Sequence, residues 1–149
     1  MYVKINGETH YLWRAVDHEG EVLESFVTKT RDKRAALAFM KKALKRHGSP
    51  ETITTDGLGS YKAAMKELGN QQKQRLGRHA NNRVENSHLP LRRRERAMPR
   101  FRRMKSLQKF ASVHANVSNH FSLERHLTDR QTCKAKRSAA FAEWQMLMA

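Results

Sequence analysis

Residues 2–28 read YVKINGETHYLWRAVDHEGEVLESFVT, and this stretch decides the fold. Asn6-Gly7 lies between two β-prone runs, and both residue types accept the positive φ angles of a two-residue hairpin turn. A second polar turn at residues 17–20 leads into another alternating run. The pattern therefore predicts a three-stranded antiparallel meander. Its strands are expected at residues 2–5, 9–16 and 21–28.

The hydrophobic period changes after this meander. Residues 32–47 carry apolar side chains at helical spacing, so we expect an amphipathic helix there. Its apolar stripe consists of Leu37, Met40 and Leu44, with Ala36 and Ala43 beside them. A β-branched run at residues 51–55 and a second helical pattern at 61–68 follow. This order predicts a mixed α/β sheet whose fourth strand runs parallel to the first. The polar connection at residues 71–78 predicts an edge strand.

The positive charge of the chain is concentrated in one segment. The formal net charge is +16, from 30 Lys and Arg against 14 Asp and Glu. Residues 73–109 hold 13 of these basic residues against only Glu85 and Glu95. Such an excess indicates a polyanionic partner, and nucleic acid is favoured over a solvated basic surface without a dedicated ligand.

Two more helical patterns follow the basic segment. Residues 104–121 repeat apolar side chains at helical spacing, and we expect this helix to pack on the sheet. The chain is polar from residue 128 and then predicts an amphipathic helix with Phe141, Trp144 and Met148. We therefore expect one domain over residues 1–127 and a polar tail with a C-terminal helix over 128–149.

The cysteine content and hydropathy argue against two protein classes. Cys133 is the single cysteine, which excludes an internal disulfide and a Cys-based zinc site and fits a reducing cytosol. No apolar run approaches the ~20 residues of a membrane helix. The first residues contain no apolar signal region. A disulfide-stapled secreted scaffold and a membrane-embedded protein are both disfavoured.

Two acidic residues occupy positions typical of functional sites. Asp56 follows the β-branched run, at a strand end where sites of α/β folds often lie, although such an Asp also caps helices. Glu85 lies near the start of an expected helix, where it equally suits the helix dipole or an ion pair with nearby arginines. A strand-end Asp and a helix Glu beside a basic segment can converge on Mg²⁺, which prefers oxygen ligands. Two such ions support phosphodiester transfer.

Two Mg²⁺ ions normally need a third carboxylate, and the first expected strand contains none. Asp17 and Glu19 lie in a segment that has the composition of a hairpin turn. The tip of such a turn is far from the strand end that Asp56 occupies. We therefore rank Asp17 below Asp56 and Glu85 as a ligand. His88 follows Glu85 by three residues on the same helical face, so it either approaches the site or packs as an ordinary histidine.

Blocks of sequence that occur in order over residues 2–127 carry a family resemblance. They are YVKI (2–5), HYLWRAVD (10–17), RDK (31–33) with Ala35-Ala36, TD (55–56), NNRVENSH (81–88), RRRER (92–96), NHF (119–121) and RH (125–126). In these blocks the chain resembles the bacterial insertion-sequence transposases of the IS-six family. The resemblance implies a DDE catalytic domain with an RNase H-like fold, a mixed sheet flanked by helices.

The resemblance assigns roles to both acids. Asp56 matches the second catalytic Asp of the family and Glu85 the catalytic Glu, so both are expected to be catalytic and to bind the two Mg²⁺ ions. The first Asp of the family would fall two positions before Met1, and the upstream helix-turn-helix region is also absent. A decayed, truncated element and a start codon assigned inside a longer reading frame both explain this.

The implied function is DNA transposition by Mg²⁺-dependent strand cleavage and transfer. Because one carboxylate is missing, we expect this chain to be inactive alone; the alternative is a non-catalytic DNA-binding or transposase-interacting fragment. The implied partners are transposon ends, target DNA, and a second copy or a full-length transposase, in the bacterial cytoplasm at the nucleoid. The DNA backbone is expected to be held by Arg83, Arg92, Arg93, Arg94, Arg96, Arg100, Arg102 and Arg103.

Overall fold

A computed structural model describes residues 1–77, 81–121 and 128–149. The elements are β1 (Tyr2–Ile5), β2 (Glu8–Val16), β3 (Val22–Thr28), α1 (Lys33–His47), β4 (Ile53–Thr55), α2 (Gly59–Glu67), the 3₁₀ helix η1 (Gln71–Lys73), β5 (Gln74–Leu76), α3 (Asn82–Ala97), α4 (Met104–Phe121) and α5 (Arg130–Met148). Arg78, Arg125, His126 and the predicted domain boundary at residue 127 lie outside the described residues.

The predicted meander is confirmed. β1 pairs antiparallel with β2, and β2 pairs antiparallel with β3. The first turn has positive φ at both central residues, 51° at Asn6 and 84° at Gly7, as the hairpin prediction requires. In the second turn, the Asp17 carboxylate accepts hydrogen bonds from the backbone N–H groups of Glu19 and Glu21, both at 2.9 Å.

The prediction of one mixed sheet that includes the fourth strand is wrong for the described residues. β4 pairs in parallel with β5 in a separate two-stranded sheet, which confirms an edge strand in the polar connection but not a single mixed sheet. The physical reason is that β1 pairs with β2 only as far as Met1, which lies opposite Leu12. The later residues of β2 and the residues of β4 line a common cavity, which lies between them. The mixed α/β class is confirmed, and the RNase H-like topology stays a prediction.

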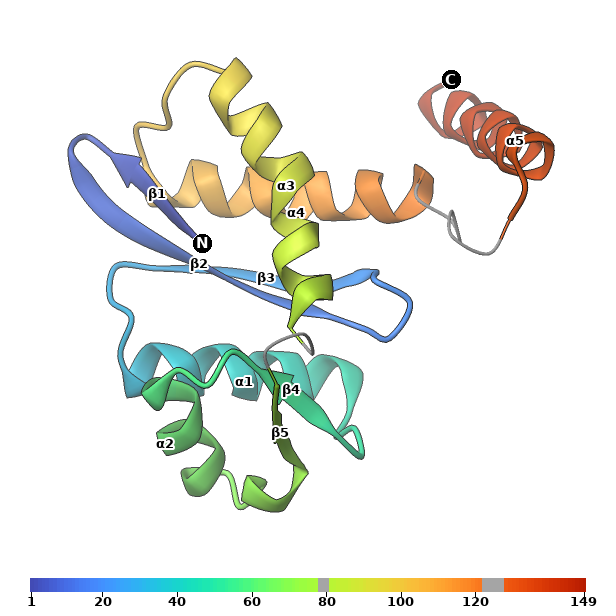
Figure 1. Ribbon diagram of the computed structural model, residues 1–149. Helices are drawn as coiled ribbons and strands as arrows, with labels where there is room; N and C mark the ends of the chain where they lie inside the picture. Colours follow the sequence, from blue (N-terminus) through green and yellow to red (C-terminus); the bar gives the residue numbers. More distant parts are fainter. Residues whose placement is uncertain (78–80, 122–127) are drawn as a thin grey trace.

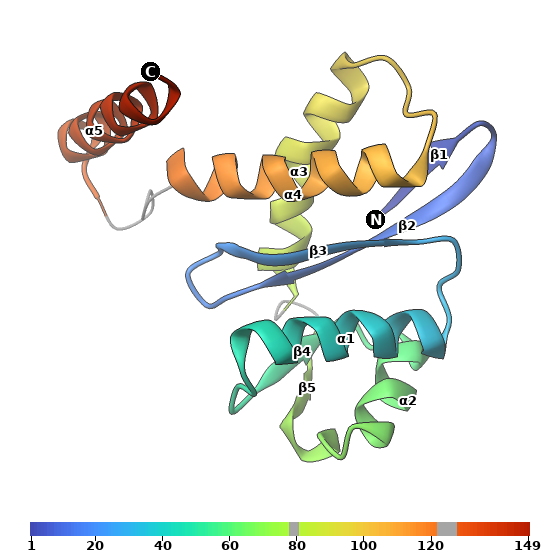
Figure 2. The same ribbon diagram turned by 180° about the vertical axis from the view of Figure 1, so that it is seen from behind.

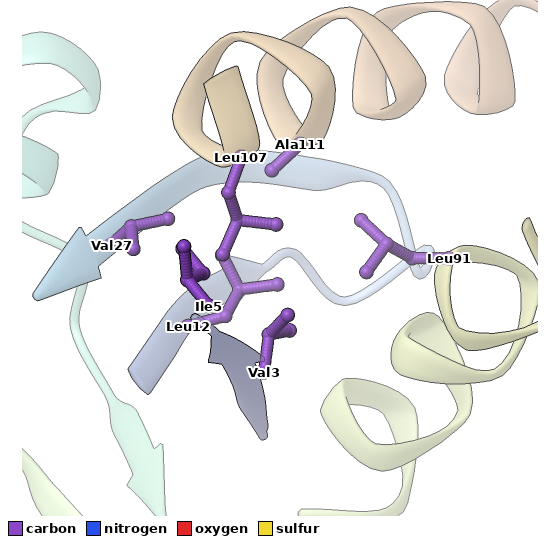
Figure 3. Packing of buried hydrophobic residues seen from close by; sticks show 7 residues of the cluster. All are labelled: Val3, Ile5, Leu12, Val27, Leu91, Leu107 and Ala111. Carbon is purple, nitrogen blue, oxygen red and sulfur yellow. The ribbon is translucent and has the colours of Figure 1, made fainter. Parts of the chain in front are cut away.

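Helices cover both faces of the meander (Figures 1 and 2). α3 and α4 lie over one face, and α1 and α2 lie over the other. On the first face, strand residues pack against Leu91 of α3 and against Leu107 and Ala111 of α4, as the helical stripe predicted (Figure 3). The strand residues in this cluster are Val3, Ile5, Leu12 and Val27.

The second core lies between the sheet and α1. The ring of Trp13 packs 6.0 Å from Phe39 of α1 and 5.3 Å from Tyr61 of α2. The helix prediction over residues 32–47 is confirmed, with Asp32 as its N-cap. Its buried residues include Phe39, which packs on Trp13, whereas Leu37, Ala43 and Leu44 of the predicted stripe are only half-buried.

α4 also bonds to the free edge of β3. The Gln108 side chain accepts from the Val27 N–H and donates to the Ser25 carbonyl, each at 2.8 Å. The Asn119 side chain makes the same pair of bonds to the N–H and carbonyl of Val22 at 2.9 and 3.0 Å. Side chains of α4 thus satisfy backbone groups that an edge strand would otherwise leave unpaired.

The predicted C-terminal helix is confirmed as α5. Asp129 caps its N-terminus, and its Trp144 ring lies 6.2 Å from Phe121 at the end of α4. Phe141 and Met148 of this helix are exposed. Within the described residues, no helix is long and apolar enough to cross a membrane.

A buried acid joins the sheet to α1 and supports a stability prediction. Glu24 is 4% exposed, and its carboxylate lies 3.2 Å from the Lys42 amine and 3.1 Å from the Arg46 guanidinium. Replacing both cations with Met should destabilise the fold by about 2–3 kcal/mol, because the buried carboxylate loses its compensation. Glu24→Gln should cost only about 1 kcal/mol, because both cations then remain in water. Urea unfolding of the variants measures this difference, and the reverse order would contradict it.

Candidate functional site

Both predicted acids line one cavity of about 660 Å³. Asp56 reaches it from the end of β4, and Glu85 reaches it from the first turn of α3. Residues of β2 and α1 complete its walls. One cavity is thus lined by two acidic residues that are 29 positions apart in the sequence.

The local contacts of Asp56 bear on its interpretation as a helix cap. One carboxylate oxygen accepts from the Leu58 N–H at 3.1 Å, and the other lies 3.4 Å from Arg31 Nη2. The N-cap of α2 is Leu58 itself, without a side-chain cap bond, so Asp56 shapes the turn and does not cap the helix. Its side chain stays about one-third exposed.

Glu85 keeps an exposed side chain in the first turn of α3. This position suits the positive end of the helix dipole, as one interpretation held. The alternative interpretation was an ion pair with neighbouring arginines. Among the described residues, Glu85 forms no ion pair. Its carboxylate is therefore open toward solvent and the cavity.

The buried arginine Arg14 lines the cavity and contacts α3. Arg14 is 4% exposed, and burial lowers its pKa to about 10. Its Nε donates to Ser25 Oγ at 3.3 Å, and its Nη1 donates to the Ser87 carbonyl of α3. Arg14 Nη2 is buried without a hydrogen-bond partner among the described residues.

His88 lies in the same cavity, as its position relative to Glu85 suggested. Burial lowers its pKa to about 3, with further contributions from the Met1 amine, Arg14 and Arg92. The imidazole is therefore neutral near pH 7. Burial and then Arg31 also lower the pKa of the Met1 amine.

The carboxylates fit Mg²⁺ in chemical type and supply only part of a ligand set. Both Asp56 and Glu85 offer oxygen donors, which a hard cation prefers. In the part of the chain that the structure describes, no three His, Cys, Asp or Glu side chains are placed to hold a metal ion. Asp17 also lines this cavity, contrary to the expected distance from Asp56, but it does not complete a set of three, and its carboxylate accepts the turn bonds from Glu19 and Glu21.

The predicted DNA-contacting arginines fall into two groups. Arg92 donates to the Tyr2 carbonyl at 2.9 Å and to Glu95 at 2.8 Å, so it joins α3 to β1. The others are exposed on α3 or on the segment between α3 and α4; they are Arg83, Arg93, Arg94, Arg96, Arg100, Arg102 and Arg103. DNA contact stays a prediction for the whole set.

Sequence reasoning missed Arg14 and Arg31 as site residues. The sequence did contain a signal for Arg14. It follows Leu12 by two residues on the same strand, so its cationic side chain shares the core-facing side of that strand. Arg31 gave no such signal, because it lies in a polar loop and meets Asp56 only through the folding of the chain.

The family model of a DDE domain of the IS240 transposase type matches residues 1–124. The chain belongs to this DDE domain family. The match includes Asp56 and Glu85 and ends before α5.

Individual relatives agree with this membership. A transposase for the insertion sequence-like element IS431mec and a transposase for the insertion sequence element IS257, both from Staphylococcus aureus, are each 42% identical over 67 residues. These matches cover 45% of this chain and 30% of each relative, so the chain spans less than a third of their length. An uncharacterized protein of Yersinia pseudotuberculosis is 32% identical over 71 residues, 46% of this chain and 66% of that protein. No solved structure matches the chain.

Proposed function

We propose that this DDE domain belongs to a machinery that cuts DNA at the ends of an insertion sequence and joins them to target DNA. The observation that carries the proposal is that Asp56 and Glu85 line the same cavity. Family membership and the transposase relatives support the same reaction class.

In this proposal Asp56 and Glu85 hold divalent cations, Mg²⁺ by the chemistry of their oxygens. When bound, such ions activate the attacking hydroxyl and stabilise the leaving oxygen of phosphodiester transfer. The Asp56 carboxylate is oriented by its bond from the Leu58 N–H, and the Arg14 bond to Ser87 holds the first turns of α3, which carry Glu85. The exposed arginines of α3 bind DNA phosphates and place the strand without reading its bases.

A third carboxylate is needed for two ions, and strand geometry supports its place. Tyr2 pairs with Tyr11, and Met1 pairs with Leu12. Continuing this register, an Asp two positions before Met1 would lie opposite Arg14. Its side chain would share the face of Val3 and Ile5, toward α3. As it stands, the 149-residue chain is proposed to be inactive in cleavage.

Metal binding tests the assignment of Asp56 and Glu85. Mn²⁺, a paramagnetic substitute for Mg²⁺, should broaden the NMR signals of residues near both carboxylates. Asp56→Asn and Glu85→Gln should each weaken the effect about tenfold or more, whereas Glu95→Gln on the same helix should leave it unchanged, because Glu95 is paired with Arg92. Broadening centred elsewhere would reject the metal site.

A further inference from the structure

Asp56 forms an ion pair with Arg31 at the cavity. The Arg31 Nη2 lies 3.4 Å from one carboxylate oxygen of Asp56, and both residues line the cavity together with Glu85. Burial raises the pKa of the Tyr61 hydroxyl, the negative charge of Asp56 raises it further, and Arg31 opposes that rise. The guanidinium of Arg31 therefore balances the charge of Asp56 within the cavity.

The contact between Arg31 and Asp56 is loose. A strong charge-assisted hydrogen bond spans about 2.7–2.9 Å, so a separation of 3.4 Å is long for an arginine and a carboxylate. About half of the Arg31 side chain is exposed, and among the described residues Asp56 is the only ion-pair partner of its guanidinium. Exposed pairs of this kind contribute little to stability. Displacing Arg31 from Asp56 therefore costs little free energy.

The backbone next to Arg31 is held in place while its side chain is exposed. The Thr30 carbonyl accepts from Thr28 Oγ1 at 2.6 Å, and the Asp32 carboxylate accepts from the Ala35 N–H at 2.8 Å. These bonds fix the chain on both sides of Arg31. Its long side chain can therefore change partner by rotation about its own bonds, without movement of the loop.

A divalent cation at Asp56 requires Arg31 to leave. Two positive groups on one carboxylate repel each other, and the repulsion is stronger when one of them is doubly charged. The displaced guanidinium needs another anion, and its planar fork of donors matches a phosphate. In the proposed function a DNA phosphate lies beside the cation. This phosphate is the acceptor within reach of Arg31 once it has left Asp56.

We propose that Arg31 couples cation binding to DNA binding. It pairs with Asp56 in the free protein and opposes a divalent cation there; when DNA is bound, it moves to a phosphate and leaves Asp56 to the cation. Each ligand then raises the affinity for the other by the same factor. The inference rests on the proposed function, because Asp56 must bind the cation and DNA must supply the phosphate.

Mn²⁺ titrations without DNA test the competition at Asp56, read from the broadening of NMR signals near that residue. Arg31→Gln should bind Mn²⁺ about three- to tenfold more tightly than the unaltered protein, because the competing charge is removed. Arg31→Lys keeps a charge and should stay close to the unaltered affinity. Arg34→Gln removes another exposed charge three residues along and, as the matched control, should change the affinity less. If Arg31 only held Asp56 in place, Arg31→Gln would bind Mn²⁺ more weakly.

Duplex DNA tests the transfer of Arg31 to a phosphate. Affinity is measured by fluorescence anisotropy with and without Mg²⁺ at constant ionic strength. Arg31→Gln should lower the DNA affinity roughly tenfold more with Mg²⁺ than without it, because the cation frees Arg31 for a phosphate. In an Asp56→Asn background, Mg²⁺ should no longer alter the effect of Arg31→Gln. Mg²⁺ shields the DNA equally for all variants, so the comparison isolates the Arg31 contact.

The outcomes separate this coupling from the proposed function. An equal or lower Mn²⁺ affinity in Arg31→Gln would overturn the coupling and leave the metal site at Asp56 standing. An effect of Arg31→Gln on DNA affinity that is the same with and without Mg²⁺ would also overturn it. Mn²⁺ that leaves Asp56 unaffected, both in the unaltered protein and in Arg31→Gln, would reject the proposed cation site together with the coupling.

Discussion

A chain extended by an Asp-Glu pair directly before Met1 is expected to nick or join element-end DNA with Mg²⁺, whereas the 149-residue chain should show no measurable activity. Continuing the register of β1 and β2 would place the added Asp opposite Arg14, which lines the cavity together with Glu85. It would complete a set of three carboxylates. Without it the transition state loses electrostatic stabilisation worth several kcal/mol.

Substitutions in the extended chain show whether this activity uses the proposed site. Asp56→Asn and Glu85→Gln should each reduce nicking about 10²–10³-fold. Glu95→Gln is the matched control on α3 and should retain activity. An active 149-residue chain would contradict the proposal, and loss of that activity in Asp17→Asn would make the turn acid the third ligand. An inactive extended chain that still binds DNA would favour the non-catalytic fragment.

Duplex DNA affinity is expected to fall ~10³–10⁵-fold between 50 and 200 mM salt, if about 6–10 phosphates are contacted. The reason is release of counterions from DNA when arginine neutralises its phosphates. Affinity should depend little on sequence, because the exposed arginines on α3 are proposed to contact the DNA backbone and not the bases. A salt titration of binding measures this dependence, and a flat response would mean that the positive charge serves another partner.

Charge-matched variants locate the DNA surface. Replacing Arg93, Arg94 and Arg96 with Ala should lower the slope of log affinity against log salt by about 0.9 for each phosphate that is no longer neutralised. The control replaces Lys41, Lys45 and Lys62, three exposed cations of α1 and α2 on the other side of the sheet. An equal effect of both triple variants would indicate a response to net charge alone. Arg92 is left unchanged, because it holds Tyr2 and Glu95.

The local elements were predictable because each depends on near neighbours in sequence. Asn6-Gly7 accepts the φ angles of its turn whatever surrounds it, and the spacing of Leu107 and Ala111 marks the buried face of α4. The resemblance in ordered blocks also pointed to the DDE family to which the chain belongs. These parts needed no knowledge of distant contacts.

The site depended on contacts between distant residues. The sequence indicated Asp56 and Glu85 as single acids, whereas their common cavity forms because β2, β4 and α3 all line it. The separate sheet of β4 and β5 was beyond local patterns, because strand pairing depends on which edges the tertiary structure leaves free. The buried Arg14 donor likewise arises only when α3 packs on the sheet and its Ser87 carbonyl meets the guanidinium. The spacing of apolar residues indicates which face of a helix or strand is buried, whereas tertiary packing determines which other element covers that face.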